Sequence, residues 1–195
     1  MKSIVSLVVA ATALVCLIAI GLSIIPGVLH DVLFIGFLFS IVVVPVAGGI
    51  TLVGLSVVWL RGNLPRTRLP APQLAMIVAM LLGTYALLSF YVPRRFAFIV
   101  SQASFDAVAR QSTVTSDTPI QLNRRLGLFW VDEYATDTRG GTYFRVYQGG
   151  DGIGPDTMSW GFAFQPNAVG TPFGSARYLT RPLGNGWYWF RASND

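Results

Sequence analysis

The sequence predicts a membrane α-helical region of three transmembrane helices, followed by a small α+β domain. In that domain we expect a juxtamembrane helix and a roughly five-stranded antiparallel meander. Two observations predict this fold class. Residues 1–93 hold three long apolar stretches with almost no charge, as transmembrane helices do. Residues 120–195 hold short alternating runs punctuated by glycine, proline and asparagine, as antiparallel strands do, and residues 94–119 join the two parts as helix and linker.

Composition and charge support this division. The chain has 195 residues, of which 53% are hydrophobic and 12% are charged, whereas about 25% of the residues of a soluble domain are charged. The net charge is +5, and after residue 93 arginines and carboxylates are interleaved. A nucleic-acid-binding domain needs a basic stripe or run, so we expect no nucleic-acid partner.

The first apolar stretch, Ile4–Ile25, carries no charge and is long enough to cross about 30 Å of hydrocarbon. We interpret it as a retained span rather than a cleaved signal. A signal peptide has an apolar core of only about 7–15 residues, and no Ala-x-Ala cleavage site follows here. Cys16 lies within this span, where we expect a buried, apolar thiol.

Two further spans are predicted at about 34–60 and 73–92. Pro45 near the middle of the second predicts a kink in the helix. Ala79 and Gly83 in the third are four residues apart, which favours close helix packing. No span contains an ionisable residue, and this argues against a transporter, channel or pump.

The basic residues predict the orientation of the chain. Four of them flank the side on which the N-terminus lies: Lys2, Arg61, Arg66 and Arg68. Arg94 and Arg95 flank the other side, so the positive-inside rule places the N-terminus in the cytoplasm. We therefore expect a protein integral to a bacterial cell membrane with its C-terminal domain extracytoplasmic.

Five strands are expected after the linker. They are Arg125–Tyr134, Thr142–Gln148, Met158–Gln165, Ser175–Arg181 and Trp187–Ala192. Arg139-Gly140-Gly141 and the segment 183–186 have the composition of hairpin turns, because glycine and asparagine accept positive φ. Strands joined consecutively by short turns form an antiparallel meander.

Aromatic residues are the candidate binding residues of this domain. The run 187–190 is Trp-Tyr-Trp-Phe, which places two large rings on each face of a strand. Either both faces are covered, or some aromatic surface is exposed to a partner. For the second case we name Trp187, Trp189, Tyr143 and Tyr147, facing lipid headgroups or another envelope protein.

The sequence after residue 93 lacks three residue types on which many catalytic and metal sites depend. Histidine, lysine and cysteine occur once each, and all three lie before residue 94. This excludes a Ser-His-Asp triad, a Schiff-base lysine and ordinary zinc ligation there. Asp132 and Glu133 are adjacent on a predicted strand, so we expect them on opposite faces, which is a poor arrangement for acid/base catalysis. We expect no enzyme and no cofactor; a carboxylate-based hydrolase is the least favoured alternative.

The glycine-rich loop 149–156 carries two carboxylates, Asp151 and Asp156. Carboxylate oxygens are calcium ligands, although the EF-hand spacing is missing. The sequence therefore favours a non-catalytic interaction domain at the membrane surface. The alternative is a sensor domain that binds calcium or a small ligand.

Overall fold

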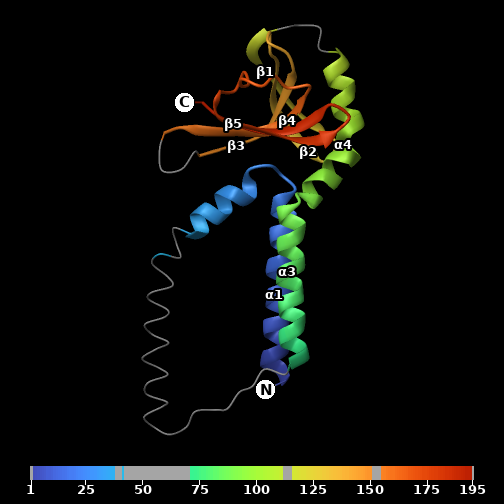
Figure 1. Ribbon diagram of the computed structural model, residues 1–195, viewed down its shortest axis with the longest axis vertical. Coiled ribbons are helices and arrows are strands. Elements are labelled where there is room, and N and C mark those ends of the chain that lie inside the picture. Colours follow the sequence, from blue (N-terminus) through green and yellow to red (C-terminus); the bar gives the residue numbers. More distant parts are fainter. Residues whose placement is uncertain (1, 38–40, 42–70, 112–115, 151–154, 195) are drawn as a thin grey trace.

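A computed structural model describes residues 2–37, 41, 71–111, 116–150 and 155–194. The described chain has four helices followed by a single antiparallel sheet of six strands (Figure 1). The helices are α1 Lys2–Ser23, the helix Val28–Phe37, α3 Ala71–Ser89 and α4 Val92–Gln111. The strands are β1 Ser116–Leu126, β2 Phe129–Thr136, β3 Thr142–Gly150, β4 Thr157–Phe164, β5 Ala176–Gly184 and β6 Trp187–Ser193.

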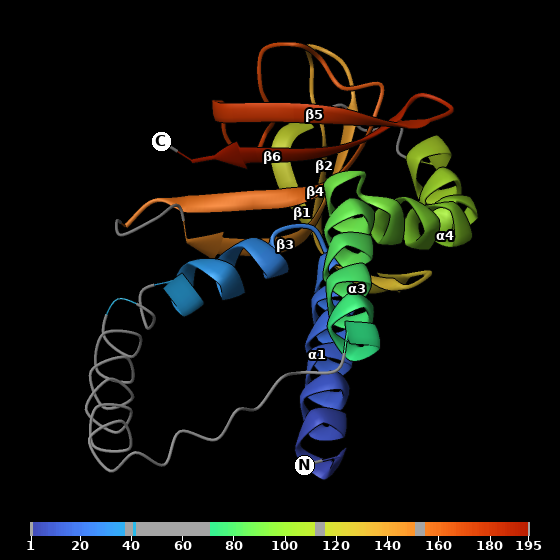
Figure 2. The ribbon, with the colours of Figure 1, turned by 60° about the horizontal axis from the view of Figure 1, so that its bottom comes forward.

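Helices α1 and α3 lie side by side and begin at the same end of the molecule (Figures 1 and 2). The Cys16 Sγ lies 4.0 Å from the Met80 carbonyl oxygen, and Ala79 and Gly83 line the groove between the helices. Both helices are long and apolar enough to cross a membrane. The first and third predicted spans are therefore confirmed as helices, while most of the span predicted at 34–60, with Pro45, lies outside the described residues.

Helix α4 follows α3 after a sharp break at Tyr91, whose φ of 55° lies in the left-handed region. The helix predicted after residue 93 is confirmed as a helix, and it covers one face of the sheet (Figure 2). Its buried side chains recur every three or four residues, as one stripe of a helix requires. They are Arg94, Ala97, Phe98, Ser101, Phe105 and Val108.

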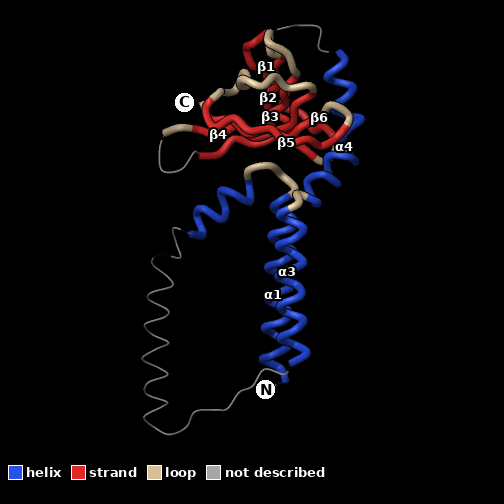
Figure 3. Tube along the Cα trace, in the orientation of Figure 1, coloured by secondary structure: helices blue, strands red, loops and turns tan. Residues whose placement is uncertain are grey.

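The strand order is β1-β2-β3-β4-β6-β5, with every neighbouring pair antiparallel. Figure 3 shows the strands gathered beyond one end of the helices α1 and α3. The prediction of a plain meander is wrong at its end, because β6 lies between β4 and β5. Trp187 and Trp189 of β6 are buried, which requires an inner position. Strand β5 exposes Arg181 and Pro182, and charge and proline are features of edge strands.

The sheet has one strand more than the roughly five predicted, because β1 begins in the predicted linker and ends inside the predicted strand Arg125–Tyr134. A two-residue turn at Gly127-Leu128 splits the predicted strand Arg125–Tyr134 into a hairpin, with Leu126 paired to Phe129. Gly127 has a φ of 61°, which suits the first central position of a tight hairpin turn. The polar composition of β1 fits an edge strand, which does not alternate strictly.

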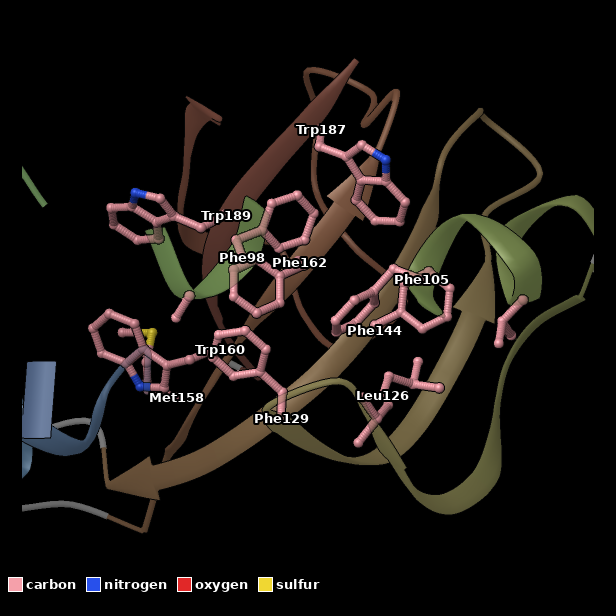
Figure 4. Close-up of a cluster of buried hydrophobic side chains, with 13 residues drawn as sticks. Phe98, Phe105, Leu126, Phe129, Phe144, Met158, Trp160, Phe162, Trp187 and Trp189 are labelled. Carbon is pink, nitrogen blue, oxygen red and sulfur yellow. The ribbon is translucent and has the colours of Figure 1, made fainter. Parts of the chain in front are cut away.

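Both faces of the sheet are covered. The helix face, covered by α4, carries Phe144, Phe162, Trp187 and Trp189 (Figure 4). The loop face, covered by the connection 165–175, carries Ala135, Tyr143, Ala163 and Phe190, with Phe173 of the connection packed against it. Neighbouring residues alternate between these two sets, as the pleat of a strand requires.

Candidate functional site

The structure places most of the predicted binding aromatics in the core. Trp187 and Tyr143 are 0% exposed and Trp189 is 4% exposed. The Trp187 Nε1 donates a hydrogen bond to Asp106 Oδ1 of α4 at 2.8 Å. The sequence left open whether both faces of the sheet are covered or some aromatic surface is exposed. Both faces are covered, and these three side chains form no exposed surface.

Tyr147 is the exception, because a register shift between Arg145 and Tyr147 turns its ring onto the helix face. Strict alternation along β3 would place it with Tyr143 on the other face, and a β-bulge reverses that order. The Tyr147 hydroxyl donates to Asp31 Oδ2 at 2.8 Å. Burial, and then the nearby Asp31 carboxylate, raise the Tyr147 pKa to about 12.

The segment between α1 and the helix Val28–Phe37 packs directly against the sheet. The His30 ring centroid lies 5.6 Å from that of Trp160. A Cβ at Gly27, whose φ is 94°, would lie 2.6 Å from the Trp160 and Tyr147 rings. Only glycine therefore allows this approach, and with the bond between Tyr147 and Asp31 it fixes the segment to the sheet.

Arg94 fastens the start of α4 to the sheet. Its guanidinium lies 4.8 Å from the Trp189 ring centroid and 5.4 Å from that of Tyr91, within the range of cation–π attraction. Burial lowers the Arg94 pKa to about 10, so the side chain is still charged at neutral pH. Trp189 in turn stacks on Trp160 at 6.5 Å, which connects α4 to the His30 segment.

Exposed apolar side chains flank this connection on both chain segments. We define the apolar junction surface as Leu33, Ile35, Phe90, Phe96, Ile99 and Val100, which are 53–69% exposed. Leu128 and Trp130 of the β1–β2 hairpin are also exposed. The Leu128 backbone N–H donates to Ser101 Oγ of α4 at 2.9 Å, which holds the hairpin against the helix.

The adjacent carboxylates Asp132 and Glu133 do not diverge as the sequence predicted. Both bind the same guanidinium: Arg145 Nε to Asp132 Oδ2 and Arg145 Nη2 to Glu133 Oε2, each at 2.9 Å. Arg145 also lies 5.3 Å from the Phe173 ring centroid. The two acids thus share one cation, which offsets half of their charge.

The structure describes only one of the two carboxylates of the predicted calcium loop. Asp151 lies outside the described residues, and Asp156 is exposed. Within the described ranges no three His, Cys, Asp or Glu side chains form a group that could hold a metal ion. The calcium hypothesis stays a prediction.

A cavity of about 460 Å³ opens between α4 and the sheet, beside the turn that joins β5 to β6. Its polar lining residues are Gln102, Asp106, Arg110 and Asn185. The Asp106 carboxylate already accepts the Trp187 N–H. One acid and one base of opposite sign give the cavity no preference for a charged ligand.

Comparison with protein-family models, curated proteins and solved structures gave no match for this chain. The geometry of the junction between the apolar helices and the sheet is therefore the basis for inferring a function.

Proposed function

We propose that this protein is a membrane-anchored, non-catalytic interaction domain that contacts the surface of its own bilayer. In this proposal α1, α3 and the span predicted at 34–60 cross the membrane. The sheet domain lies on the extracytoplasmic side of a bacterial cell membrane. The apolar junction surface enters the interfacial region, and the partner is the lipid itself.

Helix α3 is the observation that carries the proposal. It has 19 residues, none of them buried. An apolar helix in the core of a soluble protein is largely buried, and a signal sequence lies at the N-terminus, whereas α3 begins at Ala71. A bilayer is the solvent in which such a surface is stable.

The arrangement of the helices supports three crossings. Because α1 and α3 begin at the same end (Figure 1), the chain has to return between them. The sheet and the His30 segment lie together at the opposite end. The basic residues that the sequence assigns to the N-terminal side then favour a cytoplasmic location for the end away from the sheet.

The apolar junction surface gives an energetic reason for membrane contact. Fully burying one large apolar side chain stabilises a protein by about 1.5–3 kcal/mol. The six side chains of this surface are a little over half exposed, so shielding them all would recover about 5–10 kcal/mol. Interfacial lipid can supply that shielding, and the hairpin residue Trp130 is of a type enriched at that depth.

The first prediction tests this placement. Ile99→Cys, in a Cys16→Ser background, is labelled with an environment-sensitive fluorophore in the full chain in nanodiscs. We expect a blue-shifted emission that nitroxide-labelled lipids quench. The matched control is Val169→Cys, an exposed residue of the connection on the loop face, which should stay water-like and unquenched.

Each outcome decides one part of the proposal. Water-like emission at both positions would contradict membrane contact. Shielding at position 99 without lipid quenching would point to a protein partner instead. Labelling of Val169→Cys by an impermeant maleimide on intact cells is expected, and its absence would place the sheet in the cytoplasm.

A further inference from the structure

A second cavity, of about 290 Å³, lies where the helix Val28–Phe37 approaches the sheet. This volume is close to the lower end of the range for small-ligand sites, which is roughly 300 Å³. Five elements line the cavity: the helix, the end of β3 at Gly150, β4, β5 and β6. Its cationic lining residues are His30, Arg177 and Arg191, and Trp160, Met158 and Phe34 supply aromatic and apolar walls.

The charges that line this cavity have one sign. Two arginines and a histidine converge on it, and no carboxylate lies among the described residues that line it. The nearest acid on the helix, Asp31, accepts the Tyr147 hydroxyl at 2.8 Å and lies 3.6 Å from His30. A concave surface lined by cations with low-dielectric walls attracts an anion.

Two buried donors at the cavity lack an acceptor among the described residues. They are the indole Nε1 of Trp160 and the Nε of Arg191. Trp160 is 4% exposed, and its nitrogen points toward the segment after α1 (Figure 4). Buried polar groups are nearly always hydrogen-bonded, and both of these groups can only donate. The missing partner is therefore an acceptor.

A ring contact positions Arg191, and the backbone positions Arg177. The Arg191 guanidinium lies 5.9 Å from the Trp160 ring centroid. Arg177 has a φ of 49° at a register shift between Ala176 and Leu179. A left-handed φ is unfavourable for arginine, and bulges of this kind redirect a side chain toward a site.

We propose that this cavity binds a phosphate group, held by Arg177, Arg191 and the Trp160 N–H. Guanidinium groups match the oxygens of phosphate better than any other side chain does. The source is either the headgroup of an anionic lipid or free phosphate. The lipid form rests on the proposed function: the helix Val28–Phe37 exposes Val32, Leu33 and Ile35, and in the interface it would bring the cavity to headgroup depth.

The experiment follows the Trp160 indole N–H in the full chain, labelled with ¹⁵N-tryptophan. Spectra are recorded in phosphatidylcholine nanodiscs with and without inorganic phosphate, and in nanodiscs of equal parts phosphatidylcholine and phosphatidylglycerol. Trp160→Phe identifies the resonance. The Trp187 indole, bonded to Asp106, serves as the internal reference for an intact fold.

A downfield shift of the Trp160 resonance in phosphatidylglycerol alone would assign a lipid headgroup. A shift on adding inorganic phosphate would assign the free anion. No shift in either medium would overturn the proposal. The Trp160 resonance could shift with free phosphate while the fluorophore at Ile99→Cys stays water-like and unquenched. That combination would support phosphate binding in the cavity and contradict the proposed contact with the membrane.

Arg191→Gln is expected to weaken binding at least about tenfold, because it removes a charge-assisted bond. Arg181→Gln removes the same charge from an exposed position on the neighbouring strand and should leave binding unchanged. His30→Gln, at a 59% exposed side chain, provides a second variant with little risk to the fold. Equal affinity in all three variants, with the Trp187 resonance unmoved, would also overturn the proposal.

Discussion

The two faces of the sheet are covered by different chemistry. On the helix face aromatic rings pack on one another, with Phe98 4.6 Å and Phe105 5.4 Å from Phe162 between ring centroids. On the loop face a polar network centres on Asn167. Burial of rings is non-directional and scales with area, whereas a buried hydrogen-bond network depends on individual atoms. We therefore expect substitutions on the two faces to lower the free energy of unfolding by different amounts.

Asn167 organises the loop face through both ends of its amide. Its Nδ2 donates to Asp137 Oδ2 at 2.8 Å and to the Tyr143 hydroxyl at 3.0 Å. Its Oδ1 accepts the backbone N–H groups of Val169 and Gly170. One side chain thus joins the β2–β3 turn, the sheet and the covering loop.

Phe105→Ala on the helix face should have the largest effect. Phe105 is 0% exposed and contacts the rings of Phe98, Phe129, Phe144, Phe162 and Trp187. Removing a buried ring from a well-packed core costs about 3–5 kcal/mol. Urea unfolding of the full chain in detergent micelles, followed by near-ultraviolet circular dichroism, measures this loss.

Phe96→Ala is the matched control, since Phe96 lies on the same helix and is 68% exposed. We expect it to lower the free energy of unfolding by at most about 2 kcal/mol in micelles, less than Phe105→Ala does. Equal losses for the two variants would show that α4 is not held by its buried stripe.

The helix face was largely predictable from the sequence, because it depends on periodicity. Four of the expected strands lie within a few residues of β3 to β6. On α4 the helical repeat indicated Phe105 and Val108 correctly, but it also favoured Ile99 and Ala103, which are exposed, in place of Ala97 and Ser101. Strand β1 was missed because edge strands need not alternate. The position of β6 between β4 and β5 was missed because it depends on the burial of Trp187 and Trp189, and the order of the strands along the chain does not indicate it.

The junction and the cavity were not predictable, because their residues are far apart in the sequence. His30 and Asp31 had the composition of an ordinary connector, and Trp160 that of a core residue. Contacts such as Tyr147 with Asp31, 116 positions apart, depend on a bulge that no local pattern indicates. The one available signal was the isolated pair His30-Asp31 beside Pro26-Gly27, which could equally have been a turn.

Asn167→Ala tests the loop face and should have an intermediate effect. It removes the acceptor of two backbone N–H groups and a donor to Asp137, and each buried group left without a partner costs about 1–3 kcal/mol. Part of this is recovered by water, so we expect a loss of about 2 kcal/mol in urea unfolding. Hydrogen exchange at Gly170 should accelerate, while exchange in β6 should not.

Gln148→Ala serves as the control for this variant, because the Gln148 side chain is exposed and makes one bond, to Thr157 Oγ1. It should cost less than about 0.5 kcal/mol. If both variants unfold at the same urea concentration, the network contributes nothing and the loop face is held by Phe173 alone.

Asp137 gives the loop face a dependence on pH, which is the smallest of the expected effects. Burial by itself would raise the pKa of this carboxyl, but hydrogen bonds from the Arg139 side chain and backbone, its charge, and the Asn167 amide outweigh burial, so the pKa is lowered. A lowered folded-state pKa stabilises the fold above the ordinary value of 3.8. That contribution is lost as the pH falls through 3.8 toward the folded-state pKa.

Asp137→Asn removes this titration while keeping the size of the side chain. The difference in unfolding free energy between the unmodified protein and the variant should shrink on acidification from about pH 6 to about pH 3. Asp156→Asn, at an exposed position, should give a difference that hardly changes. A constant difference for Asp137→Asn as well would mean that Arg139 and Asn167 hold this side chain through the geometry of their hydrogen bonds and not through its charge.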